Sequence, residues 1–454
     1  MTREQIEAAL RASKADYTEI RLEQVESTRV VFRGPDLETA DVVLDRGGIV
    51  RCLVYGGGWG IATFNDLSDL GRRVEQACEG ARAIQAEPIA LAPVPASDDK
   101  ITVSLPDDFR GVSVTEKKSL AQSYNDILLH ADPRIVDTRT AYSDTFSRVV
   151  FANSQGSTIE EERPMVNLAF SAVAREDGNV QRGFEGLSKA AGFDAVKGHH
   201  HLAETVAQRA VDLLSAPPVE GGRYTVVCNP RMAGVFAHEA FGHLSEADFV
   251  YENPQARQMM VLGRRFGRDI LTIADDGSIP GLRGTHPYDD EGTPTGRTDL
   301  IKNGVLVGRL HSRETAAKMG ERPTGNARAT GYRYVPLVRM TNTFIGGGDT
   351  SFDAMIGGID RGIYACDAFG GETALENFSF SAAYGYMIRD GEIAELVRDV
   401  VLSGNLFVTL KHIDAIGDDF QWVEWGRCGK GQGGLPVAMG APHVRIQDVL
   451  IGGQ

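Results

Sequence analysis

Glycine is unusually frequent in this chain, where it accounts for 52 of 454 residues, compared with about 7% in typical soluble proteins. The glycines follow no fixed repeat, so we expect them at tight turns between strands and at close approaches of the backbone. Thr18, Ile20 and Leu22 alternate with polar residues, as the residues of a half-buried strand do. The sequence therefore predicts a chain built largely from strands joined by tight turns.

Charge and apolar patterning exclude several classes of partner. The chain carries 47 Lys and Arg against 62 Asp and Glu, a net charge of −15, which disfavours nucleic acid because such binding depends largely on Lys and Arg. It contains no run of 18 apolar residues and no apolar N-terminal signal, so neither a transmembrane helix nor secretion is expected. Five scattered cysteines are no disulfide framework. We expect a cytoplasmic protein that binds neither nucleic acid nor membranes.

The composition and the hydrophobic pattern change along the chain and predict three structural units. Residues 1–88 are expected to form an antiparallel sheet flanked by helices, and a proline-rich linker follows at 89–107. Alternating segments predict a β-meander, closed by a helix, at 108–216. Short strands and glycine turns occupy 221–454, which we expect to be a β-rich catalytic domain. The predicted fold class is α+β.

A helix predicted at about 230–242 carries two histidines and a glutamate in the pattern His238-Glu239-x-x-x-His243. In the familiar zinc-protease pattern the histidines are four residues apart and lie on one helix face, with the glutamate as general base. Here they are five apart. A regular α-helix would separate them by about 140° around its axis and ~7.5 Å along it, which is too far for two bonds to one zinc ion.

Gly242 offers a way to bring the two imidazoles together. A glycine can end the helix in the left-handed conformation, and a local π-type widening would place residues five apart on one side. We predict that the helix breaks or widens at Gly242, so that His238 and His243 face one metal ion. The alternative is two unrelated histidines with a solvated Glu239.

A catalytic zinc site usually has three protein ligands, and spacing alone leaves the third one open. Cys428 is favoured because glycines and two cations, Arg427 and Lys430, surround it, and nearby cations stabilise the thiolate form that binds metal. A cysteine in a glycine loop without any role is the alternative. The full set of candidates is Cys228, Cys366, Cys428, His286, His311, His412 and Glu246.

Several motifs together resemble the TldD branch of the TldD/PmbA family, zinc metallopeptidases once described as modulators of DNA gyrase. The resemblance runs from about residue 15 to the C-terminus. Its motifs are 16–21 (DYTEIR), 58–60 (GWG), 238–243 (HEAFGH), 289–294 (DDEGTP), 324–328 (TGNAR), 339–343 (RMTNT), 378–380 (FSF), 385–386 (GY) and 426–432 (GRCGKGQ).

The resemblance implies a metal site and a set of partners. His238, His243 and Cys428 match the family's metal ligands for one zinc ion per chain, and Glu239 matches its catalytic glutamate. Because this chain keeps the His-Glu motif, it resembles the catalytic branch rather than the motif-free paralogue. Family members form dimers, so a homodimer or a heterodimer with that paralogue is implied, and the implied substrates are unfolded peptides or small proteins.

These residues predict hydrolysis of peptide bonds by metal-activated water, with Glu239 as the general base. His286, Arg339 and Tyr386 are candidates for assisting the developing oxyanion, although structural roles are expected for them. The alternative function is a non-catalytic subunit that binds peptides or a partner and holds a structural zinc.

Overall fold

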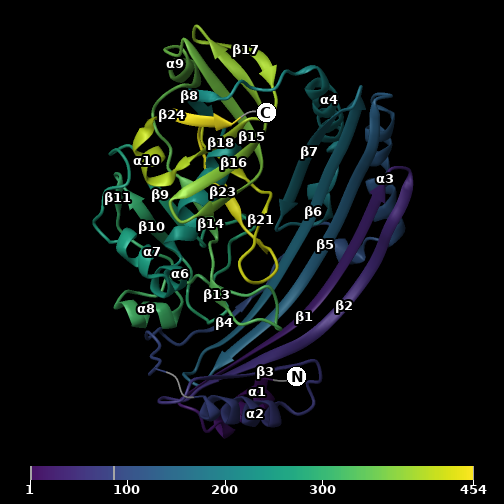
Figure 1. Cartoon of the computed structure of the whole chain (residues 1–454). Helices are drawn as coiled ribbons and strands as arrows, with labels where there is room; N and C mark the ends of the chain where they lie inside the picture. The colour runs from purple at the N-terminus through teal and green to yellow at the C-terminus, as the bar shows by residue number, and fades with distance from the viewer. Residues whose placement is uncertain (1–2, 85–86, 453–454) are drawn as a thin grey trace.

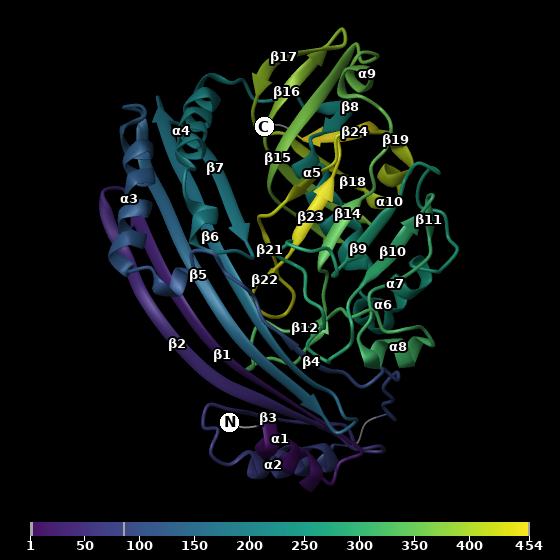
Figure 2. The same cartoon turned by 180° about the vertical axis from the view of Figure 1, so that it is seen from behind.

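Four strands of 17 to 19 residues dominate the N-terminal half of the chain. The computed structural model describes residues 3–84 and 87–452, so the outermost residues of the predicted units, 1–2 and 453–454, lie outside the described residues. The long strands form a curved sheet, and the C-terminal half of the chain lies on its concave side (Figure 1). The view from behind shows the same arrangement (Figure 2). The α+β fold class is confirmed.

The N-terminal sheet has the order β3-β2-β1-β5-β6-β4, with β7 beside β6. Its neighbours are antiparallel except β4, which runs parallel to β6. Because β1 pairs with β5 from Glu19–Asn153 to Arg33–Arg139, segments 1–88 and 108–216 share one sheet, and the predicted linker contributes β4 to it. The strands are β1 (Tyr17–Arg33), β2 (Asp36–Leu53), β3 (Trp59–Phe64), β4 (Asp98–Ile101), β5 (Ile135–Asn153), β6 (Thr158–Glu176) and β7 (Asn179–Lys189).

Alternation along the strands gives this sheet two different faces. On β5, Tyr142 and Phe146 pack in one core with residues of α3 and α4. Thr145 and Ser147, which point to the opposite face, line a cavity together with residues of the C-terminal half. The helices of the N-terminal half are α1 (Arg3–Ala12), α2 (Leu70–Ala83), α3 (Val114–His130) and α4 (His200–Ser215).

The C-terminal half is built around two further sheets. The larger has the order β15-β8-β24-β18-β16-β17, with β19 beside β24, and the other has the order β11-β10-β9-β14-β23-β20. The strands of the first are β8 (Gly222–Cys228), β15 (Arg361–Ala374), β16 (Asn377–Arg389), β17 (Glu392–Val397), β18 (Val401–Asn405), β19 (Ile413–Ile416) and β24 (Val444–Gly452). Those of the second are β9 (Ile273–Asp276), β10 (Arg297–Lys302), β11 (Val305–Leu306), β14 (Asn342–Ile345), β20 (Gln421–Val423) and β23 (Ala438–Ala441).

Two short hairpins and several short helices complete this half. The hairpins pair β12 (Ala327–Arg328) with β13 (Leu337–Val338), and β21 (Arg427–Cys428) with β22 (Leu435–Pro436). The helices are α5 (Pro230–Phe236), α6 (Ala247–Glu252), α7 (Pro254–Met259), α8 (Arg313–Met319), α9 (Phe352–Ile356) and α10 (Leu406–Thr409). Across the described ranges, every helix is too short or too polar to cross a membrane.

Candidate metal centre

The segment with the two histidines begins as an ordinary helix and then widens. Asn229 caps α5 by accepting a hydrogen bond from the backbone N–H of Met232, and Pro230 occupies the first turn, where its missing N–H costs nothing. From Ala237 to Gly242 the backbone is π-helical. The predicted widening is therefore confirmed. Gly242 has φ −57°, so the helix does not break there in the left-handed conformation.

The π-helical turn brings residues five apart onto one side of the helix. The ring centroids of His238 and His243 are 5.2 Å apart, and the ring planes meet at 82°. The sulfur of Cys428, on β21, lies 3.5 Å from Nε2 of His243. The ligand atoms that these three residues offer all lie within 4.8 Å of one another. A residue far along the chain thus joins the two histidines.

Five of the six other candidates for the third ligand lie elsewhere. His286 contacts Glu161, His311 contacts Thr315 and Glu321, and His412 contacts the carbonyl of Gln447. Cys228 and Cys366 are buried free thiols. Burial raises the pKa of Cys228 to about 12, which keeps it protonated and a poor metal ligand.

The chemistry of the three donors fits a metal ion such as zinc. His238 and Cys428 are 1% and 2% exposed, and Nδ1 of His238 is buried without a hydrogen-bond partner in the described residues. Burial by itself would raise the pKa of the Cys428 thiol, but charge and hydrogen bonds from His238 and His243 lower it to about 5. Two imidazoles and a thiolate are donors that zinc prefers.

The orientation of His243 is fixed by a buried glutamate. Oε2 of Glu246 lies 3.1 Å from Nδ1 of His243, which leaves Nε2 facing Cys428, and Nζ of Lys430 lies 2.9 Å from the same oxygen. Burial lowers the pKa of His243, but hydrogen bonds with Cys428 and Glu246 raise it to about 10. A carboxylate behind a metal-binding imidazole commonly sets its tautomer and ring direction.

Sequence reasoning considered Glu246 only as a ligand and Lys430 only as a charge beside the thiol. The structure gives both another role, because Lys430 binds Glu246 and Asp248. The largest contributions to the thiolate come from the imidazoles instead. The spacing of three residues between His243 and Glu246 was the available signal, since residues three apart are neighbours on a helix.

Glu239 lies beside the donor set and lines a cavity. Its Oε2 is 3.8 Å from Nε2 of His243, and its side chain is 30% exposed. The cavity, of about 310 Å³, lies between β7 and the C-terminal half and is also lined by His238 and by apolar side chains that include Phe184 and Trp425. A carboxylate at the edge of a cavity, next to the donors, can reach a molecule that enters it.

The candidates for assisting an oxyanion lie away from this cavity. Arg339 is fully buried and donates to the backbone carbonyl of Cys428, so it holds β21 in place. Tyr386 stacks on Tyr364 within the C-terminal sheet. His286 lines a different cavity.

Three family models match successive parts of the chain. They describe PmbA/TldA metallopeptidase domain 1, the central domain and the C-terminal domain, and they match residues 18–84, 107–214 and 221–453.

Curated relatives extend over almost the whole chain. A metalloprotease of Synechocystis sp. is 46% identical over 443 residues, covering 97% of this chain and 96% of the relative. A protein named zinc metalloprotease TldD homolog, from Saccharolobus solfataricus, is 29% identical and covers 97% of each chain.

Solved structures share the fold. A proposed modulator of a DNA gyrase from Thermotoga maritima has a TM-score of 0.81 at 22% identity, covering 99% of this chain and 100% of the other. TldE from Thermococcus kodakarensis has a TM-score of 0.77 at 18% identity, covering 99% of each chain.

Proposed function

Because the chain belongs to the PmbA/TldD family of metallopeptidases, we propose that it is a zinc-dependent metallopeptidase of the catalytic, TldD branch. His238, His243 and Cys428 would hold one zinc ion per chain, and Glu239 would act as the general base. One observation carries the proposal: three zinc-type donors, of which His238 and Cys428 are buried, lie within 4.8 Å of one another, and a carboxylate beside them opens onto a cavity.

Each residue has a distinct task in this proposal. A bound zinc ion would supply a Lewis acid that activates water and polarises a peptide carbonyl. The carboxylate of Glu239 takes the proton from the attacking water and delivers it to the leaving amine nitrogen. Glu246 keeps the His243 ring in one orientation through Nδ1, and Arg339 fixes the backbone that carries the thiolate.

The shape of the cavity supports unfolded peptides or small proteins as substrates. A space of about 310 Å³ between two halves of the chain admits a few side chains of an extended segment but no folded domain. We propose further that the protein works as a homodimer or as a heterodimer with a motif-free paralogue of its family. All five cysteines are free, which supports a reducing compartment such as the cytoplasm.

Replacing the proposed base separates catalysis from metal binding. We expect Glu239→Gln to keep one zinc per chain, measured by elemental analysis, and to cleave an unstructured fluorogenic peptide about 10²–10⁴-fold more slowly. Cys428→Ala should lose both zinc and cleavage. Glu204→Gln, which changes an exposed carboxylate on α4, is the matched control and should behave as wild type.

Two outcomes would contradict the proposal. Full cleavage by Glu239→Gln would remove Glu239 from the mechanism. Zinc in the wild type with no cleavage of any unstructured peptide would instead support a non-catalytic subunit with a structural ion.

A further inference from the structure

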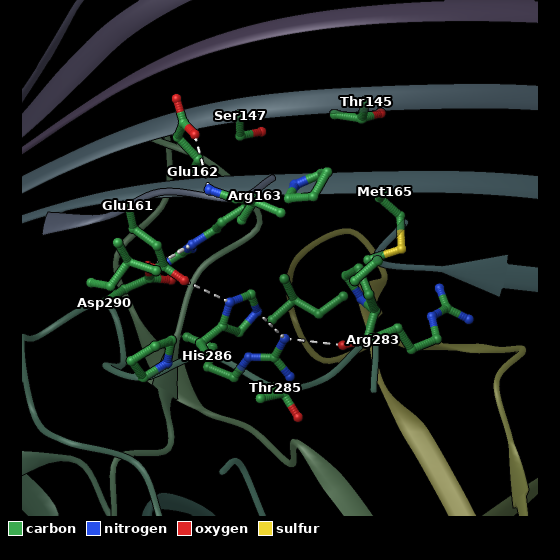
Figure 3. A pocket seen from close by; sticks show the side chains of 18 of the residues that line it. Thr145, Ser147, Glu161, Glu162, Arg163, Met165, Arg283, Thr285, His286 and Asp290 are labelled. Carbon is green, nitrogen blue, oxygen red and sulfur yellow. Dashed lines mark hydrogen bonds and ion pairs between the residues drawn. The ribbon is translucent and has the colours of Figure 1, made fainter. Parts of the chain in front are cut away.

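A second cavity, of about 350 Å³, lies between the N-terminal sheet and the C-terminal half. Figure 3 shows it from close by, with Thr145 and Ser147 on β5 along one wall and Arg283 and His286 from the C-terminal half on the opposite side. Its volume is in the range of small-ligand sites. None of the metal donors lines it, so it is distinct from the cavity at Glu239.

The acidic side chains of this cavity already have partners. Glu161 accepts from Arg163 and contacts His286, and Asp290 pairs with Arg163 and Arg21. Asp289 accepts backbone N–H groups of Glu291, Thr293 and Ala327. Glu23 pairs with Arg21, and Glu162 binds the backbone N–H of Val103 and pairs with Arg148.

Three arginines on the other side have no carboxylate partner among the described residues. Arg328 donates to the carbonyls of Met340 and Pro436, and Arg427 donates to the carbonyl of Gly434. Arg283 is 3% exposed, and its Nε and Nη1 are buried with no hydrogen-bond partner in the described ranges. The nearby acid, Glu424, is itself paired with Lys189.

An unpaired buried guanidinium is energetically costly. Two neighbouring cations increase this cost for Arg283. Burial and the charges of Arg427 and Arg328 together lower the pKa of Arg283 to about 9, against an opposing effect of Glu424. An anion beside Arg283 would relieve this cost. A carboxylate suits the site, because a guanidinium can bind both carboxylate oxygens at once.

The cavity is close in the chain to the candidate metal centre. Arg427 lines both cavities and directly precedes Cys428. On the paired strand, Leu435 lies opposite Cys428 and Pro436 opposite Arg427, and both Leu435 and Pro436 line the second cavity. The β21–β22 hairpin therefore contributes both a metal donor and part of the wall of the second cavity. A peptide bound at the donor set lies next to this hairpin.

We propose that this cavity, through Arg283 with Arg328 and Arg427, binds a carboxylate of the peptide substrate. The carboxylate is either the C-terminus of the peptide or an Asp or Glu side chain. This inference rests on the proposed peptidase function, because it names the chemistry of the substrate for that site.

Binding tests the proposal independently of cleavage. The zinc-loaded Glu239→Gln protein is titrated against fluorescein-labelled unstructured peptides, and affinity is read by fluorescence anisotropy. The four peptides are a neutral peptide with a free C-terminus, its C-terminal amide, and amides with one internal Glu or Gln. We expect the free C-terminus or the Glu peptide to bind ~10-fold more tightly than its neutral counterpart, since a charged hydrogen bond is worth about that much. Which of the two binds more tightly identifies the source of the carboxylate.

Variants then locate the preference. Arg283→Met should reduce the ratio of the affinities for the carboxylate peptide and its neutral counterpart to about 2-fold or less. The affinity for the neutral amide should stay unchanged, which also shows that the variant is folded. Arg283→Lys should retain part of the preference. Arg175→Met removes an exposed cation of β6 that lines neither cavity and should leave the preference intact.

Equal binding of all four peptides would overturn the carboxylate site, as would an undiminished preference in Arg283→Met. If Arg283→Met does not fold, the four-peptide comparison decides alone. Cleavage of the neutral amide by the wild type, with equal binding of all four, would leave the peptidase function standing without this site. A preference for carboxylate peptides without cleavage of any peptide would support the carboxylate site and contradict the peptidase function.

Discussion

The most unusual single residue is Cys428, because its thiol lies buried between two imidazoles. In the apolar interior a cysteine is normally protonated, as Cys228 is here. Hydrogen bonds and charge from His238 and His243 reverse that tendency and lower the pKa of Cys428 to about 5. In the metal-free protein the sulfur of Cys428 is therefore a thiolate, the form that binds metal, at neutral pH.

This charge state can be tested on the metal-free protein. We expect Cys428 to be a thiolate above pH ~5, so its alkylation by iodoacetamide should continue at pH 6 and fall away as the pH drops through about 5. Mass spectrometry of the modified peptide gives the midpoint. Cys428→Ser controls for the other four cysteines, and a midpoint near the ordinary value of 9 would contradict the assignment.

At the residue scale, the sequence indicated the candidate donors but not their surroundings. The spacing of His238 and His243 suggested one site, the glycines and cations around Cys428 only favoured it among several candidates, and the family resemblance implied the full set. The contact of Glu246 with His243 and the contact of Arg339 with Cys428 were not predictable, because they depend on how β21 packs against the π-helical turn.

At the scale of the element, the π-helical turn Ala237–Gly242 solves the problem of the five-residue spacing. Gly242 keeps ordinary helical angles, so its role is spatial. A Cβ atom there would lie 2.0 Å from the sulfur of Met340. The glycine is needed because another segment passes close to the widened turn.

We expect Gly242→Ala to lower the free energy of unfolding by about 1–3 kcal/mol, since it overpacks a full core. Urea denaturation measures the change. In the double variant Gly242→Ala/Met340→Ala the side chain that the new methyl group would meet is absent. The loss of stability should therefore differ from the sum of the losses in the two single variants, because the two residues are in contact.

Gly71→Ala in α2 is the matched control. No atom lies within 4 Å of the added Cβ, so this change should raise stability by up to about 1 kcal/mol. A cost for Gly71→Ala as large as that for Gly242→Ala would show that the clash with Met340 is not the cause.

The elements were predicted unevenly. Local signals suffice for some elements: Asn303-Gly304 and Asp390-Gly391 favour the tight turns that the structure has between β10 and β11 and between β16 and β17. The alternation of Thr18, Ile20 and Leu22 predicts a strand, yet β1 continues as far as Arg33. Strand length is set by the pairing of β1 with β2 and β5, which a local pattern does not contain.

At the scale of the whole molecule, buried ion pairs join the concave face of the N-terminal sheet to the C-terminal half. Asp290 is central, because its carboxylate lies 3.1 Å from Arg163 and 3.6 Å from Arg21. Arg51 of the N-terminal sheet also belongs to this interface, because it pairs with Glu19 and with Glu291 of the C-terminal half. Arg21, Arg163 and Asp290 also line the second cavity, so their contacts hold its walls in place.

We expect Asp290→Asn to lower the free energy of unfolding by about 1–3 kcal/mol, because it takes one of two counter-charges from each of two buried guanidinium groups. Arg163 keeps its pair with Glu161, and Arg21 keeps its pair with Glu23. Chemical denaturation followed by circular dichroism measures this loss. Asp299→Asn, which breaks a pair with Arg297 at the surface, should cost no more than about 1 kcal/mol. Equal losses of stability in the two variants would mean that the buried ion pairs between the two halves contribute little to the free energy of unfolding.

The separation of His243 and Cys428 by 185 positions has a consequence for when the donor set is complete. During synthesis the histidines are made first, and the thiol joins them only after the β21–β22 hairpin has been made and has packed against the π-helical turn. A copy that ends before this hairpin would hold two of the three donors. Completion of the proposed metal site is therefore coupled to the folding of nearly the whole chain.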